Sequence, residues 1–318
     1  MLISICIATH KRPSGLAKLL GSIEKQQLPN DVELEIIVID NDAEQSGAPV
    51  IGAFQQKSAL RCSYACEPVK NISLARNAAV RVARGKFIFF IDDDEVAAPD
   101  CIAKLLHTMR NCKADGVFGR VAACFHKDTP EWIRRGSFFH AAFAKIKTGA
   151  PATTTWSGNC LIRTDLLKNH SPSTVVTGHE ESVYFSGPFD PAYGVTGGGD
   201  SHLFGELMQA GAKFVYCYEA VAYEDIPPDR TNATYLLKRY LRTGNCYTRR
   251  LLERARKARV RLGAIALLKA VVYCLAAIVL AALSIGSRTY FMHWLTKLAS
   301  NVGHFMAVFR WHYQEYRT

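Results

Sequence analysis

The chain has 318 residues, 49% of them hydrophobic, which is enough to bury a full core in one large domain with an appendage. Its formal net charge of +11 belongs to the C-terminal end: residues 1–248 hold 27 Lys and Arg against 26 Asp and Glu, and residues 249–318 hold 12 against 2. A catalytic domain that binds nucleic acid usually carries its own positive surface, so nucleic acid is not expected as a partner.

The first eight residues, MLISICIA, are apolar and lead directly into the polar THKRP. They contain no basic n-region, so we expect a first strand and not a signal peptide. The ten cysteines form no CxxC pair, and the nearest two, Cys62 and Cys66, lack a second pair or a suitably placed His for a zinc site. Reduced, mostly buried thiols are therefore expected, as in a protein that faces the cytosol.

Residues 1–125 alternate between apolar runs rich in β-branched residues and segments typical of helices. Strands are predicted at residues 2–8, 34–40, 61–66 and 86–91, and helices within residues 14–27, 48–59 and 71–85. Parallel strands that are buried on both faces read as continuous apolar runs, and helices connect them. The pattern therefore predicts an α/β fold with a Rossmann-like, mostly parallel sheet flanked by helices.

Polar residues follow three of the predicted strands. Thr9 to Arg12 follow the first strand, Asp40 to Asp42 follow the second, and Asp92 to Glu95 follow the fourth. Ligands of open α/β sheets collect beyond the carboxyl ends of the strands, so these three loops are expected to form one site. Each residue also has a simpler interpretation: Asp40 and Asn41 as an Asx turn, or Thr9 as a helix cap.

The stretch FFIDDDE, residues 89–95, places four consecutive acids directly after a buried strand. Adjacent carboxylates repel one another and lose hydration, so the arrangement is costly unless they share a positive partner. A hard divalent cation is the obvious candidate. The alternative is that Asp94 or Glu95 favours a helix that opens near Pro99, but a cap needs one acid and not four.

Four segments together resemble a known family. ICIATHKRP, IIVIDND, NISLARNAAVRVARGKFIFFIDDDE and GVTGGGDSHLFGEL are similar, in order and spacing, to the nucleotide-sugar-dependent glycosyltransferases of family 2, which have the GT-A fold. Within that family the chain is most similar to enzymes that build bacterial exopolysaccharides of the succinoglycan type. The resemblance covers about residues 1–245.

The resemblance implies a role for each polar residue at the predicted site. It implies a nucleotide-diphosphate sugar as donor, a uridine diphosphate sugar by default, and Mg²⁺ or Mn²⁺ as cofactor. The Asp-x-Asp element would be Asp92, Asp93 and Asp94, of which Asp92 would bond the ribose and Asp94 would hold the metal. The other residues implied to contact the donor are Thr9, Arg12, Asp40, Arg76 and Asp93.

An acid is also needed to take the proton of the acceptor hydroxyl. The family usually has Glu-Asp at the position of GGGDSHLF, and here Gly199 replaces the Glu while Asp200 remains as the implied base. Asp200 could instead cap a helix that begins near Ser201. Many relatives also carry a metal-binding His after the last core strand; Glu224 stands roughly there, as an oxygen ligand or as a surface residue.

The implied function is inverting transfer of a sugar to a growing, lipid-linked saccharide, in the synthesis of exopolysaccharide or another cell-surface glycan. One base and direct displacement imply inversion at the anomeric carbon. Two other classes of protein remain open: a metal-dependent phosphohydrolase that uses the Asp cluster, and a catalytically inactive sugar-nucleotide-binding protein in which Gly199 marks the loss of activity.

The tail combines basic and apolar segments. Residues 249–261 hold seven cations and a single acid, Glu253, and residues 262–286 are apolar except for Lys269. This pattern predicts a catalytic domain at residues 1–248 and a helical tail at residues 249–318 that attaches it to the cytoplasmic face of the membrane. The alternative is a buried helix pair, and the sequence does not decide whether the apolar helix spans the membrane or lies in its interface.

Overall fold

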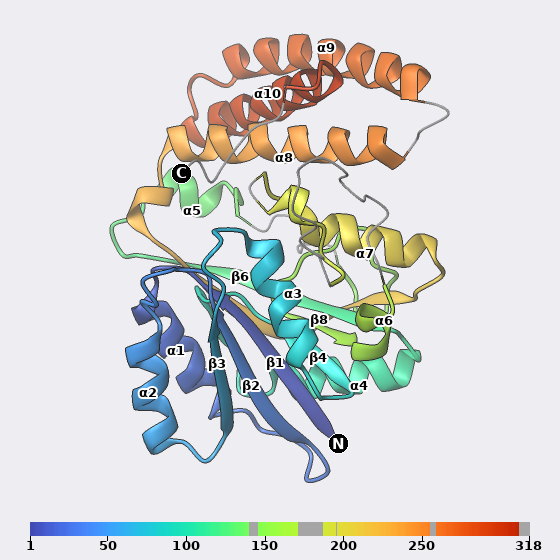
Figure 1. Ribbon diagram of the computed structural model, residues 1–318. Coiled ribbons are helices and arrows are strands. Elements are labelled where there is room, and N and C mark those ends of the chain that lie inside the picture. Colours follow the sequence, from blue (N-terminus) through green and yellow to red (C-terminus); the bar gives the residue numbers. More distant parts are fainter. Residues whose placement is uncertain (140–145, 171–186, 195, 255–258, 312–318) are drawn as a thin grey trace. The chain divides into compact units, whose positions relative to one another are not determined.

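The computed structural model describes residues 1–318 except 140–145, 171–186, 195, 255–258 and 312–318. The chain divides into two compact units (Figure 1). The sheet unit comprises residues 1–122, 142–195 and 199–225, and the helical unit comprises residues 123–141, 196–198 and 226–318. The boundary predicted after residue 248 concerns where the membrane-associating tail begins, and it stays a prediction.

The first half of the sheet alternates strands and helices as predicted. Its strands are β1 (Leu2–Thr9), β2 (Glu33–Asp40), β3 (Arg61–Cys66) and β4 (Phe87–Phe90). The helices between them are α1 (Pro13–Ile23), α2 (Ala48–Lys57) and α3 (Ile72–Val82). β1 pairs in parallel with both β2 and β4, and β2 pairs in parallel with β3. The α/β fold class is thereby confirmed.

The second half of the sheet is antiparallel. It contains β5 (Glu95–Ala97), β6 (Gly116–Phe125), β7 (Cys160–Arg163) and β8 (Phe214–Ile226). β7 pairs antiparallel with β4 and β6, and β5 with β8, in the order β3-β2-β1-β4-β7-β6-β8-β5. The result is a mixed sheet of eight strands. The short strand β5 begins within the acidic run, so the end of β8 lies beside that run.

Two apolar layers cover the sheet, because successive side chains of a strand point to opposite faces. Ile3, Ile5 and Ile7 of β1 pack on the face that α1, α2 and α4 (Cys101–Cys112) cover. Cys6 lies on the opposite face with α3, α6 (Thr164–Lys168) and α7 (Gly199–Gln209). The strands are thus held from both sides, which fixes the positions of the loops at their carboxyl ends.

A buried carboxylate ties the first strands together. Glu35 on β2 accepts hydrogen bonds from Ser4 Oγ on β1 at 2.6 Å and from the Arg84 backbone N at 2.7 Å. Burial raises the pKa of the Glu35 carboxyl, but the hydrogen bonds from Ser4 and Arg84 outweigh burial and hold that pKa below its usual value. Position 85, after Arg84, requires a glycine because a Cβ there would lie 2.5 Å from the Ser4 backbone N. The connection from α3 to β4 is therefore anchored on β1 and β2.

The helical unit contains α5 (Glu131–Arg135), α8 (Ala233–Arg254), α9 (Arg259–Leu283) and α10 (Arg288–Val308). Its apolar core includes Trp132 and Phe139 together with Leu236 of α8 and Met292 of α10. α10 packs against both α8 and α9. The predicted C-terminal helices are thereby confirmed.

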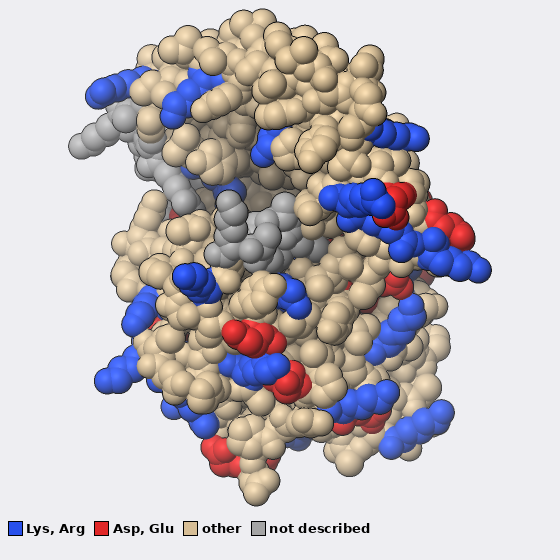
Figure 2. Space-filling model, turned by 180° about the vertical axis from the view of Figure 1, so that it is seen from behind, with Lys and Arg blue, Asp and Glu red and all other residues tan. Residues whose placement is uncertain are grey.

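α9 presents most of its apolar surface to the outside. Residues 260–283 are the one stretch of the described chain that is long and apolar enough to cross a membrane, and 17% of that stretch is buried. In Figure 2 the surface near α9, at the top of the view, is mostly free of charged side chains, with cations at its margins. Within the described residues, α9 is therefore not the buried helix that the alternative interpretation required.

Candidate active site

The loops after β1 and β4 meet at the carboxyl edge of the parallel strands. Thr9, the last residue of β1, donates a hydrogen bond from Oγ1 to Asp93 Oδ2 at 2.8 Å. In the register of β1 with β2, Thr9 lies beside Asp40, the last residue of β2. The convergence of the three polar loops that the sequence predicted is confirmed.

Arg12 provides positive charge to two of the acids. Its Nη1 lies 2.8 Å from Asp93 Oδ1 and 2.8 Å from Asp94 Oδ2. The Asp93 side chain is almost fully buried and the Asp94 side chain is 20% exposed. Arg12 stands at the N-cap position of α1, but its side chain makes no capping hydrogen bond. The side chains of Thr9 and Arg12 instead hold the acidic run against the end of β1.

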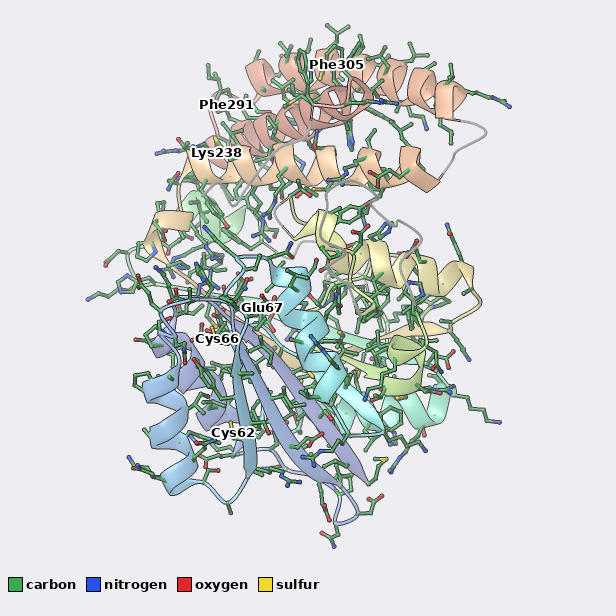
Figure 3. The ribbon with its side chains drawn as sticks, viewed as in Figure 1. Cys62, Cys66, Glu67, Lys238, Phe291 and Phe305 are labelled. Carbon is green, nitrogen blue, oxygen red and sulfur yellow. The ribbon has the colours of Figure 1, made fainter. Side chains whose placement is uncertain are left out.

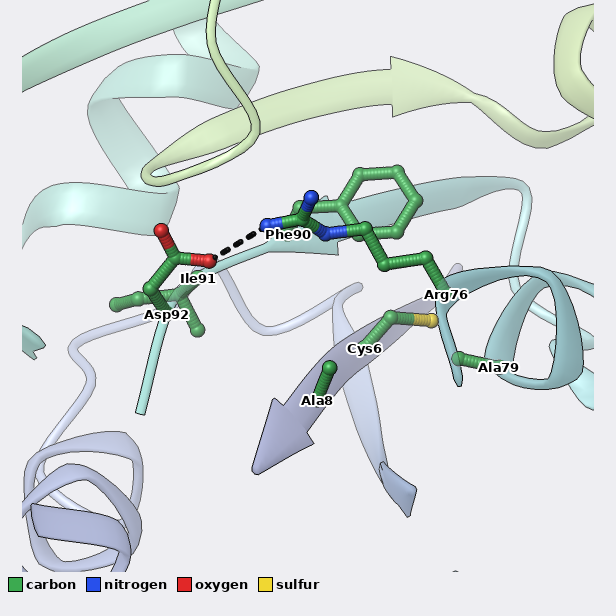
Figure 4. Close-up of a pocket in the computed structure, with 7 residues that line it drawn as sticks. All are labelled: Cys6, Ala8, Arg76, Ala79, Phe90, Ile91 and Asp92. Carbon is green, nitrogen blue, oxygen red and sulfur yellow. Dashed lines mark hydrogen bonds and ion pairs between the residues drawn. The ribbon is translucent and has the colours of Figure 1, made fainter. Parts of the chain in front are cut away.

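Arg76 provides the second positive charge. Its Nη2 lies 3.0 Å from Asp92 Oδ1, and its guanidinium lies 5.8 Å from the centre of the Phe189 ring. Figure 4 shows Arg76 reaching from α3 toward Asp92 over a recess between α3 and the ends of β1 and β4. The first turn of α3 is fixed by Asn71, whose Oδ1 accepts hydrogen bonds from the backbone N–H groups of Ser73 and Leu74.

The two arginines do not fully compensate the burial and mutual repulsion of the carboxylates. Desolvation raises the pKa of Asp92; Arg76 lowers it, but the charges of Asp94 and Asp200 raise it again, so the pKa stays above its usual value. Desolvation also raises the pKa of Asp93, although Arg12 offsets part of that effect. The site therefore favours an additional positive charge.

Two further acids, the last residue of the acidic run and a residue of β8, lie next to Asp92, Asp93 and Asp94. Glu95 and Glu224 are opposite each other in the pairing of β5 with β8, and both are buried. Desolvation raises the pKa of Glu95 well above its usual value, and the charges of Asp92 and Asp94 add to the shift. The Asp225 backbone N donates to the Asp94 carbonyl O at 3.0 Å, which holds the end of β8 beside Asp94. Glu224 is thus an interior residue next to the acidic run and not a surface residue.

Asp40 is engaged by the chain itself. Its carboxylate is fully buried; Oδ2 accepts from the Gly47 backbone N at 2.7 Å and from the Tyr64 hydroxyl at 2.9 Å. Oδ1 accepts from the Asp42 backbone N at 3.1 Å, which is the Asx turn that the sequence left open. The carboxylate therefore organises the loop after β2, and its direct contact with a nucleotide stays a prediction.

Asn41, which the sequence analysis considered only as a turn residue, connects two loops. Its Nδ2 donates to the carbonyl O atoms of Glu67 at 2.8 Å and Val69 at 2.6 Å, and its Oδ1 accepts from the Asn71 backbone N at 2.9 Å. Figure 3 shows Cys62 and Cys66 on β3 and Glu67 just beyond the end of that strand. Asn41 thereby ties the connection between β3 and α3, and with it the start of α3, to the end of β2.

Asp200 lies in the first turn of α7, which begins at Gly199. Its Oδ2 accepts hydrogen bonds from the Ser157 backbone N at 3.2 Å and Oγ at 3.4 Å, and its Oδ1 accepts from the Ser201 backbone N at 2.7 Å. Asp200 is close enough to Asp92 for its charge to raise the pKa of that carboxyl. The predicted base is thus brought to the acidic run, and Ser157, which the sequence did not indicate, orients it.

This combination defines a class of protein. A parallel sheet whose strand ends collect arginines and carboxylates is suited to a nucleoside diphosphate, and a separate carboxylate is suited to proton transfer. The model of glycosyl transferase family 2 matches residues 4–171, more than half of the chain. The chain belongs to this family. It is a nucleotide-sugar-dependent glycosyltransferase, as predicted, and nothing supports the phosphohydrolase or the inactive binding protein.

A relative that matches over most of both chains supports this membership. The succinoglycan biosynthesis protein ExoM of Rhizobium meliloti is 31% identical over 257 residues, which are 80% of this chain and 76% of that protein. The match extends beyond the part of the chain that the family model covers.

Two solved structures share the fold. The mannosyltransferase PcManGT of Pyrobaculum calidifontis aligns with a TM-score of 0.59 at 18% identity, over 94% of this chain and 86% of that one. Residues 1–349 of TarS from S. aureus align with a TM-score of 0.53 at 13% identity, over 95% and 90%. At these identities the likeness shows the GT-A fold alone.

We expect Asn41→Ala to weaken donor binding more than turnover, because the loop that positions the start of α3 loses three hydrogen bonds. The donor KM should rise on the order of tenfold, the equivalent of one to two lost hydrogen bonds, with a smaller change in kcat. Steady-state kinetics measure both. Asn111→Ala, on the exposed side of α4, is the control; equal kinetics of the two variants would contradict the role given to Asn41.

Proposed function

We propose that the chain is an inverting, divalent-metal-dependent glycosyltransferase that extends a lipid-linked saccharide in the synthesis of a surface polysaccharide. The observation that carries this proposal is the acidic run Asp92 to Asp94, compensated by Arg12 and Arg76, with Asp200 in electrostatic contact across the same site. The relative ExoM is a succinoglycan biosynthesis protein, which supports polysaccharide synthesis as the process.

The proposed donor is a uridine diphosphate sugar. Structural neighbours have been solved with UDP-GlcNAc and with GDP-Man, which supports a nucleoside diphosphate and leaves its base to be tested. Arg12 and Arg76 would bind the diphosphate, since a guanidinium matches phosphate oxygens geometrically. Asp92 would bond the ribose, while Thr9, Asp40 and Asp93 would order the loops around the nucleotide.

The proposed cofactor is Mg²⁺ or Mn²⁺ held by Asp94. The raised pKa values of Asp92 and Asp93 support a cation here, because a positive charge would relieve the crowding. Among the described residues, no three Asp, Glu, His or Cys side chains form a complete metal site, so the donor's phosphate oxygens would complete the coordination. The metal would act as a Lewis acid that stabilises the leaving diphosphate. One solved neighbour contains Mn²⁺ together with GDP-Man.

Asp200 is the proposed general base. Hydrogen bonds from Ser157 and from the Ser201 backbone N hold the carboxylate in one orientation, as proton transfer requires. Asp200 would accept the proton of the acceptor hydroxyl as that oxygen attacks the anomeric carbon from the face opposite the diphosphate. A single displacement of this kind inverts the configuration.

The proposed location is the cytoplasmic face of the membrane, with the tail after residue 248 as the attachment. Support comes from the exposed apolar surface of α9 and from the seven cations of residues 249–261, which suit anionic headgroups. A lipid-linked acceptor would then reach the catalytic domain within the plane of the membrane.

The function is tested by release of nucleoside diphosphate. Full-length protein, Mn²⁺ and a panel of UDP-sugars should release UDP only when a lipid extract from polysaccharide-producing bacteria is added as acceptor. Release without the extract would favour the phosphohydrolase, and binding without any release would favour the inactive binder. A parallel assay with GDP-mannose tests which nucleotide base the donor carries.

We expect Asp94→Asn to keep the fold and to lower metal-dependent donor affinity by about tenfold or more, because one charged oxygen ligand is replaced by an amide of equal shape. Calorimetry with UDP-sugar in the presence and absence of Mn²⁺ measures the effect. Asp100→Asn, at the start of α4, makes the same chemical change outside the site and should bind normally. Undiminished metal-dependent binding in Asp94→Asn would rule out the assignment.

Asp200→Asn should leave donor affinity close to normal and reduce kcat by about 10²-fold or more, the range that general-base catalysis supplies. Ser157→Ala should reduce kcat much less, because the Ser157 backbone N still donates to the carboxylate. Single-turnover kinetics at saturating donor measure the chemical step separately from donor binding. A fall in donor affinity that matches the fall in turnover would make Asp200 a ligand contact or a structural residue instead.

A further inference from the structure

α9 has one face that packs and one that does not. Its buried residues are small and recur every seven or four positions: Gly263, Ala270, Ala277 and Ala281. At about 100° per residue, these four lie on one narrow stripe. A Cβ at Gly263 would lie 3.8 Å from Leu252 Cδ2 of α8 and 3.9 Å from Val308 Cγ1 of α10. Because α9 packs far more extensively on α10 than on α8, the stripe faces mainly α10. Small residues on this stripe allow the two helices to approach closely.

The opposite side of α9 is an exposed aliphatic ridge. It consists of Leu268, Val272, Leu275, Val279 and Leu283, each more than half exposed. A continuous apolar surface of this length is unfavourable in water and marks a contact with another apolar phase. The partner that we consider is the membrane that the proposed function requires, and the question is how α9 is oriented in it.

The neighbours of α9 restrict its orientation. α10 follows α9 after a short turn at residues 284–287 and runs back along it, since Gly263 near the start of α9 lies beside Val308 at the end of α10. α8 runs parallel to α10: a Cβ at Gly244 would collide with the Ser300 carbonyl O, and Thr248 Oγ1 lies 2.8 Å from His304 Nδ1 one turn further along both helices. The axes of the three helices are therefore aligned, with α9 antiparallel to α8 and α10, as Figure 1 shows.

α8 cannot stand across a bilayer. Over the length that it shares with α10 it carries five cations, Lys238, Arg239, Arg242, Arg249 and Arg250; Figure 3 shows Lys238 on this helix. If α9 crossed the membrane, α10 and α8 would be aligned with the membrane normal beside it, and these charges would enter the hydrocarbon layer at high cost. A helix that lies in the membrane plane avoids this cost, because α8 then stays outside.

Lys269 agrees with the flat orientation. It is exposed near the middle of α9, so in a spanning helix it would lie close to the bilayer midplane. Around the helix it is about 100° from the packed stripe, on the flank and not on the ridge. In a flat helix a flank lysine reaches the headgroups, whereas the ridge lies deepest.

We propose that α9 lies flat in a single leaflet, with its aliphatic ridge among the acyl chains and its axis parallel to the membrane plane. This inference rests on the membrane association proposed above and adds the orientation. The partner is an anionic lipid surface: Arg261, Arg288 and Arg310, at the ends of the hairpin, are exposed to meet headgroups, as are Tyr290 and Trp311.

Two adjacent valines test the orientation. Val272 lies on the ridge and Val271 on the flank, with exposures of 54% and 45%, so they differ in angle but hardly in position along the helix. For purified full-length protein on vesicles of phosphatidylcholine and phosphatidylglycerol, Val272→Lys should weaken co-sedimentation about tenfold more than Val271→Lys does, since only the ridge is deeply immersed. Equal losses would show that both residues lie at one depth, as in a spanning helix, and would overturn the proposal.

Topology provides a second measurement that does not depend on these variants. An epitope inserted after Gly286, in the turn between α9 and α10, and another after Thr318 should both be accessible from the face that carries the catalytic domain. Access to either epitope only from the opposite face would establish a crossing and overturn the flat orientation. If the wild-type protein stays soluble without detergent and does not bind vesicles, the membrane association itself fails, and glycosyl transfer remains testable by UDP release.

Discussion

The concentration of negative charge at one edge of the sheet is the constraint on which the site depends. Asp92, Asp93 and Asp94 follow a fully buried strand, and Glu95 and Glu224 lie opposite each other next to them. Carboxylates this close repel one another and lose hydration, so the fold must bring positive groups to them. Arg12 comes from the loop after β1 and Arg76 from α3, and both reach the run only while β1, α3 and β4 keep their relative positions. The buried Glu35, which links β1, β2 and the connection after α3, stabilises those positions.

The parallel half of the sheet was predictable because each of its strands and helices can be recognised from a short stretch of sequence. A strand buried on both faces reads as a continuous apolar run, and the helix that returns the chain follows it directly. The antiparallel half was not predictable in this way. β5 has three residues and β7 has four, which is too short for any periodicity to be visible. The partner of β5, strand β8, lies far away along the chain, so no local pattern shows the contact of Glu224 with the acidic run, and only the family resemblance suggested it.

Within the site, sequence reasoning identified the loops better than the side chains. The family resemblance implied that Asp40 contacts the nucleotide, which stays a prediction, and it did not reveal that three donors of the chain hold this carboxylate. The neighbouring Asn41 ties the loops together, and no local pattern distinguishes two adjacent polar residues that point in different directions. Ser157 and Asp200 are 43 positions apart, and only the packing of α7 near β7 makes the serine a partner of the proposed base. Spacing thus predicts which segments converge, and packing decides which oxygen faces the substrate.

The helical unit shows why hydropathy alone does not determine how a helix meets a membrane. The composition of α9 fits a spanning helix, and its length fits as well. Its orientation, however, is shared with the helices to which it is bound. Gly244 and Gly303 bring α8 and α10 so close that larger side chains there would collide with the opposing backbone. This contact couples the cations of α8 to the apolar surface of α9 through α10, so neither can change its angle to the membrane alone. The charge of one helix therefore constrains the orientation of another that it hardly touches.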